Sequence, residues 1–232
     1  MKSLWFVVPA WQRYELTKVC LEQKLSVIDH LLQKDIDCSL VLVADDANLD
    51  IAKSLDFHTV VQNNDWLGRK FNDGIEYAAN HGADWIVPIG SDSWIHPSFF
   101  DKLPPDDKVM TSRLYTAVKR DKMAKLKITS VGGVGPYVLP YSILQPLSFR
   151  PVQDKIKRGI DRSTRKSLGD VEWVNNDLFH LQYVGFRGTP TITSYDSLVK
   201  FWKVSEHNMP WTHLASHYDR ALVKKARKAL KR

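Results

Sequence analysis

Four short apolar runs mark the first hundred residues, and each is followed by a polar cluster or a proline. They span residues 4–8, 39–44, 59–61 and 85–89. Runs of this length without polar alternation are typical of strands that are buried on both faces of a parallel sheet. Helical patterns separate the runs, and this alternation is typical of βαβ units. The sequence therefore predicts an α/β fold with a mostly parallel central sheet flanked by helices.

The helices are predicted from apolar spacing and from turn residues. Residues 15–33 place their apolar side chains on one helical face, and residues 70–81 form a helix that ends at the C-cap residue Gly82. The other predicted elements are a weak helix at 49–55, strands at 109–118 and 177–186, and helices at 140–147, 161–168 and 215–232.

No break in composition separates a second domain. Residues 1–210 are therefore predicted to form one domain, with halves at 1–100 and 101–210. Residues 211–232 are predicted to be a C-terminal segment that ends in a basic helix.

Charge and cysteine usage narrow the class of protein. The chain carries 33 Lys and Arg against 26 Asp and Glu, a net charge of +7, which favours an anionic partner such as a nucleotide, a nucleic acid or an acidic surface. Its cysteines, Cys20 and Cys38, form no C-x-x-C motif and are expected to be reduced and buried. Neither a secretory signal nor an apolar run of about 20 residues is recognisable, so a soluble, cytoplasmic protein without stable membrane insertion is expected.

Polar side chains follow each predicted strand of the first half, at 9–13, 45–46, 63–69 and 91–93. In a parallel sheet these strand ends meet at one edge, so one pocket is expected there. An aromatic side chain with nearby cations suits a nucleotide, and acids beside a diphosphate suit a bridging divalent ion. The sequence therefore favours a nucleotide site at this edge.

The order and spacing of three segments carry a family resemblance. They are Val-Ala-Asp-Asp-Ala-Asn-Leu-Asp at 43–50, Leu-Gly-Arg-Lys-Phe-Asn-Asp-Gly-Ile at 67–75, and Ile-Gly-Ser-Asp-Ser-Trp-Ile-His-Pro at 89–97. Over about the first hundred residues the chain resembles the family-2-like inverting glycosyltransferases of the GT-A fold. The resemblance implies transfer of a sugar from a nucleoside-diphosphate donor, UDP favoured, to an acceptor hydroxyl, with a protein or a glycan as the acceptor.

The resemblance also implies a donor site. Trp11 would stack on or flank the base, Asp46 would accept a hydrogen bond from the base edge, and Arg69 or Lys70 would lie near the diphosphate. The full set implied for the donor is Pro9, Ala10, Trp11, Arg13, Asp45, Asp46, Gly68, Arg69, Lys70, Ser91, Asp92, Gly132 and Gly133.

The resemblance further implies a divalent metal, Mn²⁺ or Mg²⁺. Asp92 corresponds to the second acid of the family's Asp-x-Asp motif, whereas Gly90 stands where the first acid is expected. The metal would need a further ligand, and a late histidine supplies one in several GT-A enzymes. His213 and His217 are the candidates, and the sequence does not choose between them.

Inverting transfer also needs a general base for the acceptor hydroxyl. The Glu-Asp pair of the family is missing from the expected region. Asp161, after a flexible Arg-Gly-Ile segment, is the preferred candidate, with Asp170 and Asp177 as alternatives. Gly132 and Gly133 would line the floor between donor sugar and acceptor.

Simpler interpretations stay open for several of these residues. Asp92 could cap a turn, Trp11 could pack in the core, and the basic residues of 224–232 could be a solvated helix face or meet an acidic partner. A nucleotidyltransferase is disfavoured because such enzymes usually carry a glycine-rich loop after the first strand, and residues 9–13 lack glycine. A nucleic-acid-binding module is disfavoured because the basic residues are scattered without a known motif.

Overall fold

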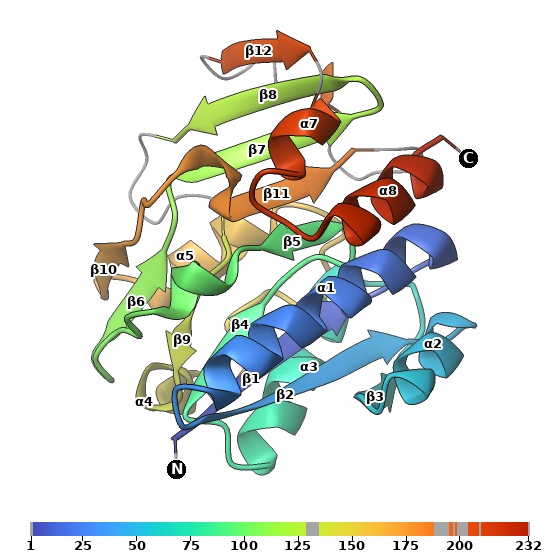
Figure 1. Cartoon of the computed structure of the whole chain (residues 1–232). Helices are drawn as coiled ribbons and strands as arrows, with labels where there is room; N and C mark the ends of the chain where they lie inside the picture. Colours follow the sequence, from blue (N-terminus) through green and yellow to red (C-terminus); the bar gives the residue numbers. More distant parts are fainter. Residues whose placement is uncertain are drawn as a thin grey trace.

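The computed structural model describes residues 2–128, 135–187, 195–196, 198, 204–208 and 210–231. A five-stranded sheet in the order β3-β2-β1-β4-β9 combines four strands from the first hundred residues with β9 from later in the chain (Figure 1). All neighbouring strands are parallel except β9, which pairs antiparallel with β4. The strands are β1 (Lys2–Pro9), β2 (Ile36–Ala44), β3 (His58–Val61), β4 (Trp85–Pro88) and β9 (Leu139–Pro140).

Helices cover both faces of this sheet because alternate residues of a strand point to opposite faces. Leu4, Phe6 and Val8 of β1 pack in one apolar cluster with helices α1 (Tyr14–Leu32) and α2 (Asn48–Ser54). Trp5 and Val7 pack in another cluster with α3 (Leu67–Asn80). The runs in β1, β2 and β4 are therefore largely buried, as predicted. The run at 59–61 is an exception, because β3 is an edge strand and its Val61 is 75% exposed.

A second five-stranded sheet, in the order β12-β8-β7-β11-β5, lies above the first in Figure 1. It consists of β5 (Ser93–Ile95), β7 (Leu114–Lys119), β8 (Lys122–Lys127), β11 (Tyr183–Phe186) and β12 (Val204–Asn208). Only the β11–β7 pair is parallel in this sheet. Because β5 follows β4 after a short turn, the chain crosses from one sheet to the other at residues 89–92.

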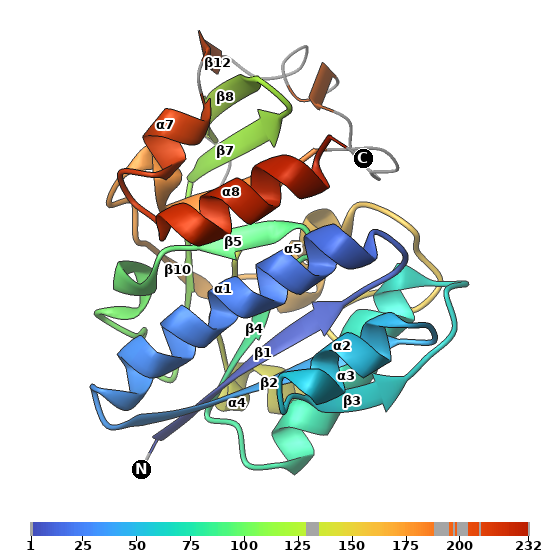
Figure 2. The ribbon, with the colours of Figure 1, turned by 45° about the vertical axis from the view of Figure 1, so that its right-hand side comes forward.

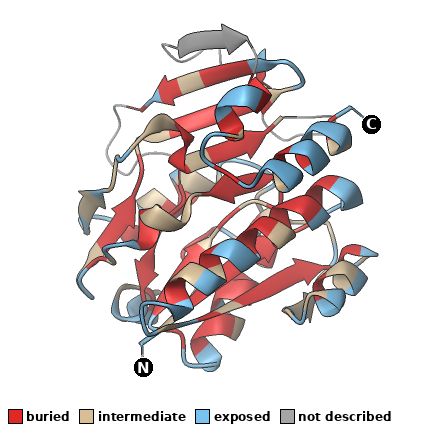
Figure 3. Cartoon of the chain, in the orientation of Figure 1, coloured by how far each residue is buried: buried red, intermediate tan, exposed pale blue. Residues whose placement is uncertain are grey.

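Helices α7 (Pro210–Leu214) and α8 (Arg220–Ala229) share an apolar cluster with α1 and the second sheet. Figure 2 shows α8 running beside α1, and in Figure 3 most strands of both sheets are largely red, the colour of buried residues. The remaining elements are β6 (Lys108–Thr111), β10 (Glu172–Asn175), α4 (Tyr141–Leu144), α5 (Ile160–Leu168) and the 3₁₀ helices η1 (Pro97–Phe100), η2 (Gln145–Leu147) and η3 (His180–Gln182). Strands β6 and β10 form a separate parallel pair.

The second half departs from the predicted elements at several points. The strand expected at 109–118 is two strands, β6 and β7, because the Asp177 carboxylate accepts from the Arg113 backbone and side chain and turns the chain there. The strand expected at 177–186 keeps only its last four residues, β11. The C-terminal helix begins at Arg220, where the Asp219 side chain accepts from the Leu222 amide as an N-cap. Among the described helices, none has the length and apolar character needed to cross a membrane.

Candidate functional site

The four strand-end loops of the first sheet are joined by polar contacts. The backbone amide of Gln12, which follows β1, donates at 3.2 Å to Oδ2 of Asp46, which follows β2. The Asn64 side chain, after β3, donates to the Asp45 carboxylate. Arg13 Nη1 donates to Asp92 Oδ2, after β4, at 3.1 Å. The structure thus brings the loops together at the carboxyl edge of the sheet, as the sequence predicted.

A cavity of about 430 Å³ opens among these loops and is called the Trp11 cavity here. Its lining includes six of the residues predicted for the donor: Pro9, Ala10, Trp11, Arg13, Lys70 and Ser91. Trp11 is 50% exposed, so it is not a core residue and its ring is accessible to a ligand. A flat aromatic ring beside cationic side chains is suited to a nucleobase that carries phosphates.

A smaller cavity of about 210 Å³, the Asp92 cavity, adjoins the first and shares Pro9, Arg13, Ser91 and Arg158 with it. Asp92, Asp161 and Arg187 line it from three separate parts of the chain. The two cavities together offer space for an elongated, anionic ligand, with the carboxylates gathered in the smaller one.

Asp92 is almost buried and is held by two guanidinium groups. Its Oδ2 accepts from Arg13 Nη1 at 3.1 Å and from Arg187 Nη1 at 3.3 Å, and its Oδ1 accepts from the Ser93 hydroxyl at 3.2 Å. Burial by itself favours the neutral acid, but Arg187 and Arg13 outweigh it and hold the pKa of Asp92 below its usual value. Asp92 is therefore an ionised carboxylate, and its contacts exceed those of a simple turn cap.

Lys70 is the basic residue of α3 that reaches the Trp11 cavity. Its Nζ donates to the Ala10 carbonyl at 2.8 Å and also to the Asn64 side chain. Burial lowers the pKa of Lys70, while Asp45 and Asp46 act in the opposite direction. Neither acid is among the residues that line the two cavities.

Asp46 instead organises the start of α2. Its Oδ1 accepts from the Asn48 amide at 3.0 Å and from the Asn48 side chain at 2.7 Å. Its predicted contact with a base edge stays a prediction.

Gly68 and Arg69 lie at the start of α3 and are engaged by the chain itself. The Gly68 amide donates to the Ile156 carbonyl at 3.0 Å, and the Arg69 amide donates to the Asp154 carbonyl at 3.1 Å. A Cβ at Gly68 would lie 2.0 Å from the Gln153 carbonyl oxygen. These residues hold the segment that leads to Lys157 and Arg158, which do line the Trp11 cavity.

Asp161 lies in the first turn of α5 and lines the Asp92 cavity. Burial raises its pKa, and the guanidinium of Arg165 only partly offsets this effect. The alternatives lie elsewhere, since Asp177 is paired with Arg113 at 2.7 Å and Asp170 is exposed in the turn after α5. The predicted Gly132 and Gly133 fall outside the described residues.

Arg187 was not among the residues predicted from the sequence. It follows β11, whose antiparallel pairing with β5 brings it beside Asp92. Its side chain also donates to the Tyr115 hydroxyl, and its backbone amide donates to Val118 at 2.7 Å. A signal was present, because Arg187 directly follows a predicted strand, as the other polar clusters do. Lys157 and Arg158 were likewise not assigned to the site, and Asn64 was expected there only as part of the polar cluster at 63–69.

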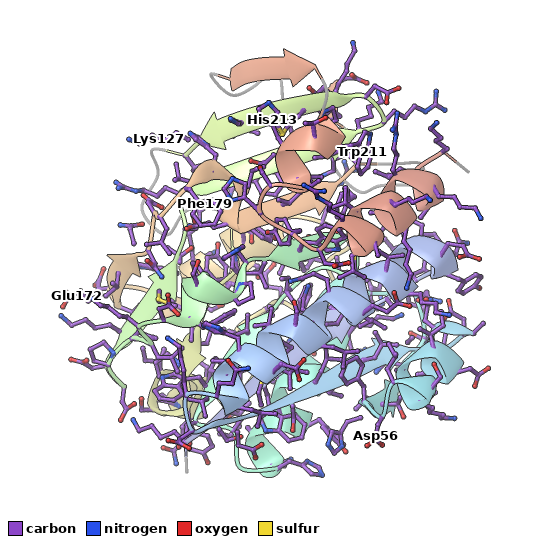
Figure 4. All side chains as sticks on the ribbon, viewed as in Figure 1. Asp56, Lys127, Glu172, Phe179, Trp211 and His213 are labelled. Carbon is purple, nitrogen blue, oxygen red and sulfur yellow. The ribbon has the colours of Figure 1, made fainter. Side chains whose placement is uncertain are left out.

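The residues around Asp92 do not fit the predicted divalent metal. His213 lies on α7 near Trp211 (Figure 4), and His217 stacks on Phe179 at 4.9 Å; neither lines the Asp92 cavity. Within the described ranges, no group of three His, Cys, Asp or Glu side chains could hold a metal ion. The contacts of Asp92 are instead guanidinium and hydroxyl donors.

Comparisons with known proteins bear on the fold. No protein-family model and no curated protein sequence matches the chain. Among solved structures, S. aureus TarS 1–349 is similar with a TM-score of 0.56 at 14% identity, over 80% of this chain and 60% of TarS. A second structure of the same protein, in complex with UDP, has a TM-score of 0.56 at 13% identity, over 81% of this chain and 61% of that one.

A mutant of Drosophila β1,4-galactosyltransferase 7, in complex with manganese, UDP-Gal and xylobiose, is similar with a TM-score of 0.53 at 8% identity. The match covers 86% of this chain and 80% of the galactosyltransferase. The chain thus spans about 60% of the length of the TarS structures and most of the length of the galactosyltransferase. A mixed α/β architecture with a central sheet flanked by helices is common to all of them, and this chain has a GT-A-like fold.

Proposed function

We propose that the chain is a glycosyltransferase that moves a sugar from a nucleoside-diphosphate donor, UDP favoured, to an acceptor hydroxyl with inversion. One observation carries the proposal: two adjoining cavities at the carboxyl edge of the sheet combine an exposed Trp11, several cations and two acids. Ligands of open α/β sheets bind at this edge. A nucleotide base, a diphosphate and a sugar need these three kinds of contact, in this order along the molecule.

In this proposal the donor lies across both cavities. The base stacks on Trp11, and the diphosphate lies beside Lys70 of the Trp11 cavity and Arg13, which lines both cavities. The sugar then extends into the Asp92 cavity, which Asp161 lines. Charge-assisted hydrogen bonds from Arg and Lys to phosphate oxygens are stronger than neutral ones, so the diphosphate is the anchor.

The chemical step is one displacement at the anomeric carbon. The acceptor oxygen forms a bond to C1 while the bond from C1 to the phosphate oxygen breaks, and the bonding electrons leave with the nucleoside diphosphate. The acceptor proton passes to the Asp161 carboxylate, whose raised pKa makes it a stronger base than an ordinary aspartate. Attack from the face opposite the leaving group inverts the anomeric configuration.

The acceptor is proposed to be a glycan or a protein side chain. The Drosophila galactosyltransferase structure contains xylobiose, which is a glycan. Transfer to small glycans, followed by proton NMR of the anomeric configuration of the product, tests both the acceptor class and inversion.

Isothermal titration calorimetry tests donor binding directly. UDP, GDP and dTDP are titrated into the wild type and into Trp11→Ala, with Tyr14→Ala as the matched control, because Tyr14 is also exposed but lines neither cavity. We expect Trp11→Ala to weaken UDP binding by about 10-fold through lost stacking, and inorganic pyrophosphate binding to change by less than about twofold. Tyr14→Ala should bind UDP as the wild type does.

Two results would contradict the proposal. The first is that no nucleoside diphosphate binds, with EDTA or with Mn²⁺. The second is release of pyrophosphate from a nucleoside triphosphate and a sugar phosphate, which would instead identify a nucleotidyltransferase. Salt-dependent oligonucleotide binding without any response to sugar nucleotides would favour a nucleic-acid-binding protein.

A further inference from the structure

The Arg13–Asp92–Arg187 cluster, defined by these three side chains, has one more positive than negative charge. Both arginines contact the same oxygen, Asp92 Oδ2, at 3.1 and 3.3 Å. The three side chains are only 19%, 11% and 17% exposed, in that order. Buried charges are normally balanced, because an unpaired one loses its hydration. Arg158 and Asp161, which also line the Asp92 cavity, add one charge of each sign, so the surplus remains and indicates a site for an anion.

Arg187 has hydrogen-bonding capacity left over. Its Nη1 donates to Asp92 and its Nη2 donates to the Tyr115 hydroxyl, but its Nε is buried without a hydrogen-bond partner among the described residues. The Arg187 side chain is 17% exposed and lines the Asp92 cavity, and each terminal nitrogen of a guanidinium group carries a second N–H. A phosphate oxygen can accept from these N–H groups, and guanidinium groups match phosphate geometry closely.

A divalent cation is disfavoured at the same place. An ion bound to Asp92 Oδ2 at about 2 Å would lie within about 6 Å of both guanidinium nitrogens, where like charges repel strongly in a partly buried site. Gly90 brings no second carboxylate, and neither candidate histidine lines the cavity. The ion would have to displace at least one arginine to bind.

The basic character extends beyond the cluster. Lys70, Lys157 and Arg158 line the adjoining Trp11 cavity, and no acid lines that cavity among the described residues. Cations gathered in a cleft raise the local concentration of an anionic ligand.

We propose that Arg13 and Arg187, positioned by Asp92, neutralise the diphosphate of the donor in place of a divalent metal. This inference rests on the proposed function. Asp92 is then a positioning residue for two arginines rather than a metal ligand. When the bond from C1 to the phosphate oxygen breaks, the electron pair stays on that oxygen, and the guanidinium groups stabilise the new charge by hydrogen bonds without transferring a proton.

The first test compares UDP binding to the wild-type protein by calorimetry in EDTA and in Mn²⁺. We expect the two dissociation constants to agree within about threefold, since the arginines carry the charge neutralisation. A loss of more than about tenfold in EDTA would overturn the metal-independent site while leaving the proposed function intact. Absence of UDP binding under both conditions would overturn both.

The second test uses Asp92→Asn, for which the two accounts predict different results. The amide oxygen of the substituted side chain can still accept from both arginines, so they stay in place. With the carboxylate charge removed, we expect UDP to bind in EDTA as tightly as before or up to about tenfold more tightly. If Asp92 ligates a metal, the same substitution weakens UDP binding in Mn²⁺, and that result contradicts the proposal.

A third variant tests the same proposal if Asp92→Asn folds poorly. Arg187→Gln should weaken UDP binding in EDTA by about tenfold or more, because a charge-assisted contact is lost. Arg227→Gln is the control, because Arg227 is half exposed on α8 and lines neither cavity. Its ion pair with Asp121 is loose, at 3.8 Å. Equal affinity of Arg187→Gln and Arg227→Gln for UDP would overturn the proposal.

Discussion

The two sheets contribute to the candidate site in different ways. The first sheet is parallel from β3 to β4, and its contribution comes from successive strand-end loops that follow one another along the chain. The second sheet is mostly antiparallel, and it contributes Arg187 through the pairing of β11 with β5, nearly ninety positions apart in sequence. The order of strands along the chain is therefore sufficient to place the residues of the strand-end loops. Arg187 is placed only by the long-range pairing of β11 with β5.

The segment from Val152 to Arg158 leads into α5 and packs in the apolar cluster of the first sheet. Asn72 of α3 donates to the Val152 carbonyl at 2.6 Å and to the Asp154 carboxylate at 2.7 Å, and the Val152 amide donates back to Asn72 at 3.1 Å. This helix, part of the first half, thereby fixes the segment that leads into α5 and Asp161. Gly68 and Arg69, which were predicted from the sequence to bind the donor, thus donate their backbone amides to this segment, whereas Lys70 of the same helix lines the Trp11 cavity.

The largest expected effect concerns the acid from the second half. Asp161→Asn removes the proposed base while keeping the shape of the side chain, so sugar transfer should fall by about 100-fold or more. UDP affinity should not fall, because Asp161 does not line the Trp11 cavity. Steady-state kinetics and calorimetry on the same preparation separate the two effects.

The pH dependence of sugar transfer tests the assignment of Asp161 as the general base. Burial raises the pKa of Asp161, so the carboxylate is lost at a higher pH than for an ordinary aspartate. The acid limb of the kcat profile should therefore be displaced upward in pH in the wild type and absent in Asp161→Asn. A variant with nearly wild-type kcat would show that another residue takes the proton.

A smaller effect is expected where α3 holds the connecting segment. Gly68→Ala places a Cβ 2.0 Å from a backbone oxygen of Gln153, which cannot move like a side chain. The free energy of unfolding should fall by about 3 kcal/mol, the upper end for overpacking. Urea denaturation measures this change.

Asn80→Ala is the control for Gly68→Ala, because Asn80 is exposed at the other end of α3. If both variants were equally stable, the segment would not be held at Gly68 as the structure indicates.

The smallest effect concerns Lys24 of α1, at the crossing between the two sheets. Its Nζ is buried and donates to the Ser93 carbonyl at 2.7 Å, and burial lowers its pKa to about 8. Between pH 8 and the ordinary lysine value the unfolded chain binds more protons at this residue than the folded chain. The contribution of Lys24 to stability therefore rises with pH, by about 2 kcal/mol from pH 8 to pH 10.

The Lys24 contribution is isolated by subtracting the stability of Lys24→Met from that of the wild type at each pH. The subtraction is needed because burial raises the pKa of the nearby Cys20 thiol to about 12, and this group lowers stability as the pH rises. A difference that stays constant from pH 8 to pH 10 would contradict a buried, perturbed Lys24.

The prediction of the site from sequence worked best where chemistry follows directly from strand order. Trp11, Arg13, Lys70 and Ser91 were predicted at the pocket and line it. Asp161 was placed only by a loose match, yet it lines the Asp92 cavity.

The prediction was least informative where a side chain has competing local partners. Arg69 and Lys70 were equal candidates for binding the diphosphate, but the structure places the two residues differently. Lys70 lines the Trp11 cavity, whereas Arg69 lines neither cavity. The helix rotation that decides this depends on packing of α3 against β1, where Gly74 allows close approach to Val7.

The sequence by itself determined the parallel first sheet and the meeting of its polar strand ends, because burial on both faces requires continuous apolar runs and parallel strands end at one edge. Only the tertiary structure decided what surrounds Asp92. Its partner Arg187 is nearly a hundred positions away in sequence, and the candidate histidines pack elsewhere. Which charges meet in a buried site depends on how the second sheet pairs, and no local pattern in the chain encodes that pairing.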